Sequence, residues 1–551
     1  MILRLLAREE LPELRTLLLL TLFFGPAYFL FLGSAPLIEP DEARYAEIAR
    51  EMLERGDFIT PHLNYVKYFE KPPLHYWLTA LSFALLGQDE FAARFPGALA
   101  GLLGILWTYH LGRRVLGPAE GLLAALTLGT CVGYQAQARL NIIDPTLTTC
   151  LSVALGSFLI ASREGERSSR TYYHLFFLSA ALAVLAKGLI GIVLPLGIIG
   201  LYLILTRRFS LLRQIPLWTG LPLFLAVSAP WFIVVGLKNP EFFNFFFVHE
   251  HFQRYLSTVH HRVEPFWWYL PIYLLTILPW SFFLPAALAS LWRPSPALDG
   301  RIFLWLWTGV ILLFFSLSKS KLIPYILPVL PPSALLLGPT FLESFAGRAF
   351  VGRLLLYAAS IACALTGVVT IVLHFWPRPP LDSTAGVIMA AIFLSGGLLG
   401  LLGSRAGNRL GVFAALCLAW WVLEIVALPP VVERWAEAER KSSKELCLLA
   451  ARKGPEGARL ASYGWYEQAL PFYAGRRVMV VGPKGELAFG SMLGDQSAWF
   501  LEPPQFESLW DSDTPLVTII DERNLPAFSQ SVKTPPRALG RQDRRVAITN
   551  R

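Results

Sequence analysis

Long apolar blocks recur along the sequence and limit what the chain can fold into. Three of them are Leu17–Leu32, Phe95–Leu111 and Ile302–Leu317. About twenty apolar residues in a helix, rising about 1.5 Å per residue, cross the roughly 30 Å hydrocarbon core of a bilayer. Only 16% of the 551 residues are charged, whereas soluble domains carry about a quarter. The blocks therefore predict a polytopic α-helical membrane protein.

The most economical threading has about thirteen transmembrane helices. The predicted spans lie near residues 17–34, 95–112, 119–137, 146–162, 172–187, 190–206, 217–237, 268–291, 302–317, 322–342, 350–376, 385–403 and 409–428. The first block lacks an A-x-A cleavage site, so we expect it to be retained as a span. The apolar stretch 74–87 is short and interrupted by His75, which predicts a helix lying along the membrane interface.

Arginine and lysine fall mostly in alternate short loops, of which 113–114, 207–208 and 348–353 are examples. Loops of this kind face the cytoplasm. The opposite side then receives residues after about 430 and four polar segments. These segments are 35–73, 138–145, 238–267 and 318–321. Orientation loops also account for the net charge of +9, so no nucleic-acid partner is predicted.

The sequence changes character at Val431, where charged residues become frequent. Two β-like runs, Arg477–Val481 and Pro515–Ile520, stand between helical stretches and turns. The length is enough for one small α/β domain. We therefore divide the chain into a transmembrane domain, 1–430, and a C-terminal domain, 431–551. The transmembrane domain includes an outer juxtamembrane loop, 35–94, and an outer loop, 238–267.

The outer segments carry cations on the side that membrane proteins usually keep poor in Lys and Arg. They are Lys67, Lys71, Arg139, Lys238, Arg254, Arg262, Lys319 and Lys321, and Lys187 lies close to the same face. Ionisable groups near the membrane are costly unless they are paired or used. The set indicates an anionic ligand such as a lipid-linked phosphate, although any single lysine can simply extend its amine into water.

The first outer segment is the densest in polar groups. Pro40 followed by Asp41 and Glu42 is typical of a helix start. Asp41, Arg44 and Tyr45 then share one helical face. A carboxylate, a guanidinium and a phenol displayed together suit a phosphate-bearing substrate. The alternative is an ordinary ion pair at a helix N-terminus.

The remaining outer segments give weaker signals. Asp144 precedes Pro145, a common turn and cap arrangement. His249 and His251 form an H-x-H pattern, which indicates a metal site less strongly than H-E-x-x-H does. Tyr325 follows the basic run that starts at Ser318.

Five strings carry a resemblance to a known family. They are EPDEARYAEIAREML from Glu39, YFEKPPLHYW from Tyr68, ARLNIIDPT from Ala138, HEHFQRY from His249 and SKSKLIPYILPVLPP from Ser318. In this order they resemble the ArnT-like lipid A aminoarabinose transferases, undecaprenyl-phosphate-sugar glycosyltransferases related to the protein O-mannosyltransferase group. The resemblance implies a C-type glycosyltransferase fold with about 13 transmembrane helices, juxtamembrane helices between the first two, and a small C-terminal α/β periplasmic domain.

The resemblance also implies a reaction and a location. The enzyme would move 4-amino-4-deoxy-L-arabinose from undecaprenyl phosphate to a lipid A phosphate, giving resistance to polymyxin and other cationic peptides. The active site would face the periplasm from a multi-pass protein of the bacterial inner membrane. Its partners would be the lipid-linked sugar, the lipid A or lipopolysaccharide precursor and membrane lipids, and the protein would be a monomer.

Roles transfer by motif from the family to this sequence. Asp41, Asp144 and Lys71 would be catalytic. The donor phosphate and substrate would be bound by Arg44, Tyr45, Tyr68, Arg254, Lys319, Lys321 and Tyr325. Glu70 and His251 match positions associated with a divalent metal, zinc or a similar ion. We expect Asp41, Lys71 and Asp144 to face one pocket.

The residues leave several questions of chemistry open. A leaving phosphate needs preorganised cations, which Arg44 and Lys71 can supply. Asp41 acts either as a general base or as an orienting carboxylate, because an acceptor phosphate is already ionised at neutral pH. Transfer of another polyprenyl-phosphate-linked sugar to lipopolysaccharide or protein is the alternative function. A lipid flippase or transporter is the alternative from a different class, but it predicts mid-depth charges and paired broken helices.

Overall fold

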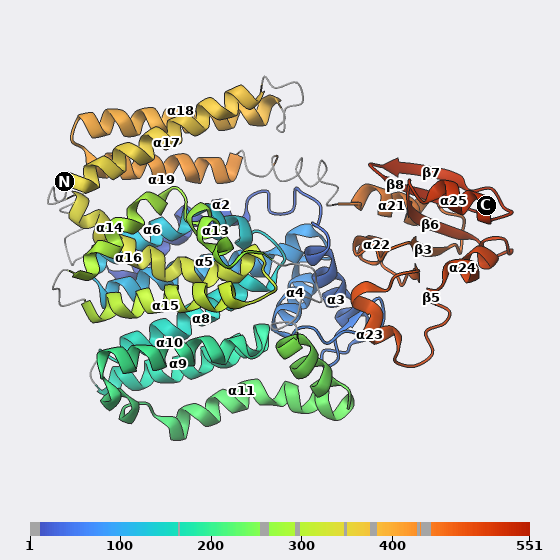
Figure 1. Ribbon diagram of the computed structural model, residues 1–551, viewed down its shortest axis with the longest axis horizontal. Coiled ribbons are helices and arrows are strands. Elements are labelled where there is room, and N and C mark those ends of the chain that lie inside the picture. The colour runs from blue at the N-terminus through green and yellow to red at the C-terminus, as the bar shows by residue number, and fades with distance from the viewer. Residues whose placement is uncertain are drawn as a thin grey trace. The chain divides into compact units, whose positions relative to one another are not determined.

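The computed structural model describes residues 12–163, 166–253, 264–292, 298–345, 350–374, 383–426, 430 and 442–551. Its chain forms two compact units (Figure 1). The helical unit comprises Met1–Leu32 and Arg94–Val431, and the sheet unit comprises Gly33–Ala93 and Val432–Arg551. The domain division predicted at 430 left the outer segment 35–94 with the transmembrane helices. In the structure this segment packs with the C-terminal residues instead.

Within the described residues, each predicted span overlaps one helix or a run of consecutive helices. The unbroken ones are α2 (Glu13–Phe29), α5 (Glu90–Val115), α8 (Ile143–Ala161), α9 (Glu166–Lys187), α10 (Ile190–Thr206), α11 (Leu217–Lys238), α15 (Leu298–Leu317), α17 (Phe350–His374), α18 (Ser383–Arg405) and α19 (Arg409–Val426). Within the described ranges, 8 helices are long and apolar enough to cross a membrane, or up to 9 if a bent pair counts as one span. The expected polytopic helical fold is confirmed.

Three predicted spans are each broken into shorter helices. They are α6 (Pro118–Gly129) with α7 (Val132–Ala138), α13 (Tyr269–Thr276) with η4 (Trp280–Phe283) and α14 (Leu284–Ala289), and η6 (Ile323–Val329) with α16 (Leu330–Phe345). The second of these spans bends by 108° between Thr276 and Trp280. Pro279 stands at this bend, and a proline lacks the N–H that would continue the helical hydrogen bonds. Apolar composition thus predicted where these spans lie in the sequence, but not where their helices are interrupted.

The sheet unit contains a six-stranded sheet in the order β5-β4-β3-β6-β8-β7. Its strands are β3 (Arg459–Tyr463), β4 (Met479–Val481), β5 (Phe500–Leu501), β6 (Leu516–Asp521), β7 (Arg537–Gln542) and β8 (Arg545–Thr549). Strands β5, β4, β3 and β6 are parallel, while β8 and β7 complete the sheet in antiparallel pairs. The two β-like runs predicted from the sequence become β4 and β6.

Helices cover both faces of this sheet. In β6, Val517 and Ile519 join one apolar core while Leu516 and Ile520 join the other, as the two-residue period of a strand requires. The first core also contains residues of α3 (Asp41–Arg55), α4 (Leu74–Leu86), α21 (Lys444–Lys453) and α22 (Ala469–Ala474). The second contains residues of α24 (Pro503–Trp510) and α25 (Leu525–Ser531). The outer segment therefore contributes α3 and α4 to the first core, where α3 packs against α22, and α4 confirms the short helix predicted at 74–87.

Candidate active site

Asp41 begins α3, as the acidic run after Pro40 predicts. The Glu42 carboxylate accepts a hydrogen bond from the backbone N–H of Ile38 at 2.8 Å, which fixes the entry to the helix. Arg44 donates to the Asp41 carboxylate three residues earlier, and its guanidinium carbon lies 4.9 Å from the centre of the Tyr45 ring. The predicted grouping of Asp41, Arg44 and Tyr45 on one helical face is confirmed.

Arg44 is deeply buried and has a second carboxylate partner. Its side chain is 6% exposed, and the other end of the guanidinium pairs with Glu486, in the 3-10 turn η7 (Gly485–Leu487). Burial tends to lower the pKa of Arg44, but the carboxylates of Glu486 and Asp41 hold it above its ordinary value. The cation is therefore permanent, and each end of its fork is held by one acid.

Buried hydrogen-bond donors without a partner lie on and near this cation, since Tyr68 and Tyr76 both interact electrostatically with Arg44. Within the part of the chain that the structure describes, Arg44 Nε and the hydroxyls of Tyr68 and Tyr76 have no hydrogen-bond partner. Burial raises the pKa of the Tyr68 phenol well above its ordinary value, so the hydroxyl keeps its proton. Buried donors are normally satisfied, and convergent unsatisfied donors suit an anionic ligand such as a phosphate.

Lys71 lies in the turn that follows Tyr68. Its ammonium donates to the backbone carbonyl of Glu70 at 2.8 Å and is half-buried. The lysine therefore has a backbone anchor that holds its charge in the same outer segment as Arg44.

The helical unit holds a second cluster around Asp144, in the first turn of α8. The Lys187 ammonium at the end of α9 lies 2.5 Å from Asp144 Oδ1, with both side chains about nine-tenths buried. The same ammonium lies 4.5 Å from the centre of the Tyr325 ring, within the range of a cation–π interaction. Asp144 and Tyr325 were predicted site residues, and Lys187 joins them. Whether they share a pocket with Asp41 and Lys71 stays a prediction.

The run from Ser318 to Tyr325 is held by backbone contacts. Tyr269 donates its hydroxyl hydrogen to the Leu322 carbonyl at 3.0 Å and accepts the Leu322 N–H at 3.1 Å. Lys321 is buried and donates to the Ser318 carbonyl at 2.6 Å, whereas Lys319 is exposed. The two predicted ligand lysines therefore differ in environment. The ammonium of Lys321 is bonded within its own loop, whereas the side chain of Lys319 faces solvent.

Arg139 has a structural role in the helical unit. Its guanidinium donates to the carbonyls of Ala27 and Leu30. These carbonyls lie at the C-terminal end of α2, where unsatisfied oxygens attract a cation. The reading of Arg139 as part of an anion-binding set is not supported by these contacts.

The metal prediction stays open. Within the described ranges, no three His, Cys, Asp or Glu residues gather to hold a metal ion. The His251 side chain lies outside the described residues, as does all of Arg254. The shared metal site of Glu70 and His251 therefore remains a prediction.

Two site residues carry no strong sequence signal. Glu486 lies in a Gly-Pro-Lys-Gly-Glu turn, which looks like an ordinary surface loop. Lys187 ends an apolar helix and resembles a lysine that reaches toward the interface. Glu486 pairs with Arg44, and Lys187 pairs with Asp144. Both partners are distant in sequence, so no local pattern predicts either pair.

Two family models match the chain. Residues 70–234 match the model described as dolichyl-phosphate-mannose-protein mannosyltransferase. Residues 446–550 match the model described as aminoarabinose transferase C-terminal domain. The first match covers α4 and the Asp144–Lys187 cluster, and the second covers the sheet and Glu486.

Curated relatives match over most of their length. An undecaprenyl phosphate-alpha-4-amino-4-deoxy-L-arabinose arabinosyl transferase of Aeromonas hydrophila is 35% identical over 439 residues, which are 76% of this chain and 79% of the relative. A protein of the same name from Shewanella sediminis is 28% identical over 540 residues, 94% of this chain and 95% of the relative.

Solved structures agree with the fold. The crystal structure of ArnT from Cupriavidus metallidurans bound to undecaprenyl phosphate has a TM-score of 0.83 and 29% identity, covering 97% of this chain and 98% of that one. The archaeal oligosaccharyltransferase AglB from Archaeoglobus fulgidus has a TM-score of 0.51 at 14% identity, covering 95% of this chain and 71% of that one. The second likeness concerns the fold alone.

Proposed function

Because the chain belongs to the undecaprenyl phosphate-4-amino-4-deoxy-L-arabinose arabinosyl transferase family, we propose that it transfers this amino sugar from undecaprenyl phosphate to a phosphate of lipid A. The protein is a multi-pass membrane glycosyltransferase. One observation carries the assignment of the site. Arg44 is a buried cation that pairs with both Asp41 and Glu486. Its own Nε and the Tyr68 hydroxyl are donors without a partner that suit a phosphate.

The reaction exchanges one phosphate for another at the anomeric carbon of the sugar. The bond from that carbon to the undecaprenyl phosphate oxygen breaks, and its electron pair leaves with the lipid phosphate. An oxygen of the lipid A phosphate forms the new bond from the opposite side. Negative charge therefore grows on the leaving phosphate, where fixed cations lower the barrier.

Arg44 and Lys71 are the cations proposed for the leaving phosphate. Arginine suits a phosphate because its planar fork presents several donors in fixed directions. Arg44 Nε and the Tyr68 hydroxyl are two of the buried donors that have no hydrogen-bond partner within the described residues. Lys71 adds a compact charge whose position is set by the Glu70 carbonyl.

Asp41 acts in this proposal as an orienting and electrostatic group. A phosphate acceptor is already ionised near neutral pH, so no proton has to be removed. The Asp41 carboxylate holds Arg44, and its charge can also stabilise the positive character that develops on the sugar ring. A hydroxyl acceptor would instead require Asp41 to act as a general base.

The Asp144–Lys187–Tyr325 cluster has a supporting role in the proposal. Asp144 pairs with the buried Lys187 ammonium at 2.5 Å, and the Tyr325 ring lies against the same ammonium. Removing either charge would leave the other without its partner, which is strongly destabilising in a buried site. We assign the cluster to the transferase site on the basis of its motifs.

Location, oligomeric state and metal are further parts of the proposal. The protein would lie in the bacterial inner membrane as a monomer, with its active site at the periplasmic face. The charged tail and outer segments support this orientation. A zinc-type ion at Glu70 and His251 would be detected by metal analysis of the purified protein, with less bound metal after Glu70→Ala.

The decisive experiment reconstitutes the purified full chain with undecaprenyl-phosphate-linked aminoarabinose and lipid A. Mass spectrometry should find lipid A that carries the added pentosamine. In a transferase-null host that still makes the donor, expression should also restore polymyxin resistance. Product formed only with another lipid-linked sugar would support the alternative transferase. Movement of lipid between leaflets without covalent product would support a flippase.

A further inference from the structure

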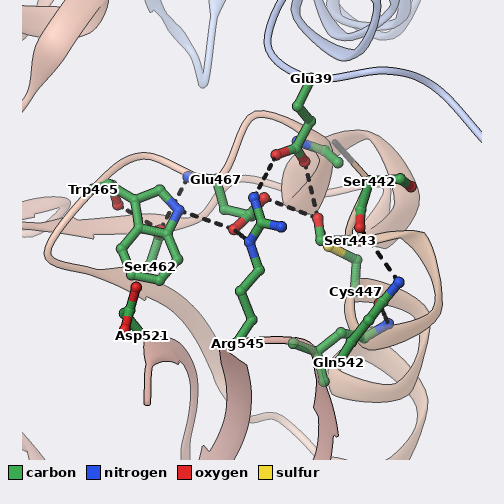
Figure 2. A network of polar contacts seen from close by, with 12 residues as sticks. Glu39, Ser442, Ser443, Cys447, Ser462, Trp465, Glu467, Asp521, Gln542 and Arg545 are labelled. Atoms are coloured by element: carbon green, nitrogen blue, oxygen red, sulfur yellow. Dashed lines mark hydrogen bonds and ion pairs between the residues drawn. The ribbon is translucent and has the colours of Figure 1, made fainter. Parts of the chain in front are cut away.

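A buried polar cluster joins the turn before α3 to the C-terminal residues of the sheet unit (Figure 2). Glu39 precedes α3, Ser443 precedes α21, Glu467 precedes α22 and Arg545 begins β8. Arg545 Nη2 lies 3.1 Å from Glu39 Oε2, and Arg545 Nε lies 2.8 Å from Glu467 Oε2. We call these four residues the Glu39 cluster. It joins residues 506 positions apart in the sequence.

Further hydrogen bonds fix both carboxyl groups of the Glu39 cluster. The Ala469 N–H donates to Glu39 Oε1 at 3.1 Å, and the Trp465 indole N–H donates to Glu467 Oε2 at 2.9 Å. The side chains are almost fully withdrawn from solvent, with Glu467 at 0% and Glu39 at 10% exposure. These hydrogen bonds fix the orientations of the Glu39 and Glu467 carboxyl groups.

The geometry of Ser443 indicates that the two carboxyl groups share one proton. Ser443 Oγ lies 2.9 Å from an oxygen of Glu39 and 2.9 Å from an oxygen of Glu467, but a hydroxyl has a single hydrogen to donate. A proton on one carboxyl group supplies the missing donor. It also balances charge, because Arg545 then faces a single carboxylate. Burial beside Glu467 raises the pKa of Glu39, which assigns the proton to Glu39.

The Glu39 cluster is adjacent in sequence to the candidate catalytic residue. Asp41 follows Glu39 by two positions, and α3 starts there. Glu486, another C-terminal residue, holds Arg44 one turn further along. The first turn of α3 is thus fixed at both ends by residues from beyond 440.

We propose that the Glu39 cluster positions the first turn of α3 for sugar transfer, with Glu39, Glu467 and Arg545 as positioning residues that act through Asp41 and Arg44. This inference rests on the proposed function of those two residues. Two acids and one base buried together are a poor way to gain stability, since apolar side chains of similar volume often do as well. Their value lies in directional bonds that allow one orientation of the turn.

The test measures transfer kinetics of the full-length protein with Glu39 replaced. Glu39→Ala should lower kcat about tenfold while donor KM changes by no more than about twofold, as expected when orientation rather than binding is lost. Glu39→Gln resembles the protonated carboxyl group in shape and charge, so it should recover most of the kcat lost in Glu39→Ala. Hydrogen exchange should quicken in the 39–45 peptide of the alanine variant.

Matched variants separate positioning from general loss of fold. Glu522→Ala removes an acid that pairs with Arg541 at 2.6 Å in an exposed ion pair of the same unit and should leave transfer unchanged. The double variant Glu467→Gln with Arg545→Met removes the carboxylate and the guanidinium together, so neither charge is left buried without its partner. It should melt near the wild type but keep the low kcat of Glu39→Ala.

A pH profile provides a readout that packing alone would not change. A raised pKa for Glu39 means that its contribution is present at low pH and is lost as pH rises through that value. Activity of the wild type should therefore fall on the alkaline side, and Glu39→Gln should remove that fall. Glu467, Arg545 and the Cys447 thiol, whose Sγ lies 3.3 Å from Ser443 Oγ, are the other ionisable groups facing the cluster.

Failure of this inference differs from failure of the proposed function. If the wild type makes no aminoarabinose-modified lipid A, the proposed function is wrong and the kinetics cannot support positioning either. If the wild type is active and a folded Glu39→Ala or double variant transfers at the wild-type kcat, the positioning role is overturned.

Discussion

The most direct test of the site is Asp41→Asn, which keeps the side-chain shape and removes the charge. In the wild type the Asp41 carboxylate holds one end of the Arg44 guanidinium, while Glu486 holds the other. The substitution therefore leaves Arg44 with a carboxylate partner. The buried cation is not stranded, so the change tests chemistry rather than folding.

The expected loss of stability is small. The Asp41 side chain is 44% exposed, and an ion pair with one exposed partner contributes about 0–1 kcal/mol. Losing an acid at a helix N-terminus costs a further 0.3–1 kcal/mol, roughly. The total free energy of unfolding should fall by no more than about 2 kcal/mol.

The expected loss of activity is larger. If the carboxylate acts in the transition state, transfer should fall a hundredfold or more, which is about 2.7 kcal/mol. The assay is single-turnover transfer from undecaprenyl-phosphate-linked aminoarabinose to lipid A, quantified by mass spectrometry, alongside thermal unfolding in the same detergent. Glu522→Gln, in the exposed Glu522–Arg541 pair, is the matched charge control.

Three results would refute this reasoning about Asp41. Folded Asp41→Asn with near-normal transfer would leave the carboxylate as a simple helix-start residue. A drop in transfer that only follows a drop in folded protein would show that Asp41 acts through stability. A drop as large in Glu522→Gln would show a general effect of charge.

Three further predictions follow from the other contacts. Lys71→Ala should lower transfer about a hundredfold, because it removes a cation proposed for the leaving phosphate; normal transfer would remove Lys71 from the site. Asp144→Ala should destabilise the protein by about 3–5 kcal/mol because it strands the buried Lys187, and Lys187→Met added to it should restore melting but not transfer. Burial raises the pKa of the Cys447 thiol, so maleimide labelling at pH 7 should be slow in native protein and fast after unfolding; fast native labelling would contradict its buried position.

The site residues divide between local and distant contacts. Arg44 pairs with Asp41 within one helical turn, but its other partner, Glu486, lies in the C-terminal half of the chain. Lys187 reaches Asp144 across the α8–α9 pair. Substitutions at Glu486 or Lys187 should therefore affect transfer although neither residue lies in a quoted family string.

The sequence by itself determined the features that depend on local chemistry. The length and polarity of an apolar block fix whether it can cross a bilayer, so every predicted span is helical. The acidic residues after Pro40 predicted the start of α3 at Asp41, and helical spacing predicted its ion pair with Arg44. The short β-like runs at 477–481 and 515–520 predicted strands β4 and β6.

Only the tertiary structure decided which distant groups meet. The Asn64 side-chain amide donates to the Val478 carbonyl across 414 positions, and Glu39 reaches Arg545 across 506. No local pattern encodes such pairs, because they depend on which faces of helices and strands pack together. The outer segment 33–93 joins the C-terminal residues for this reason: its helix α3 shares an apolar core with α21, α22 and residues of the sheet, and burial of that shared core selects the polar contacts at its edge.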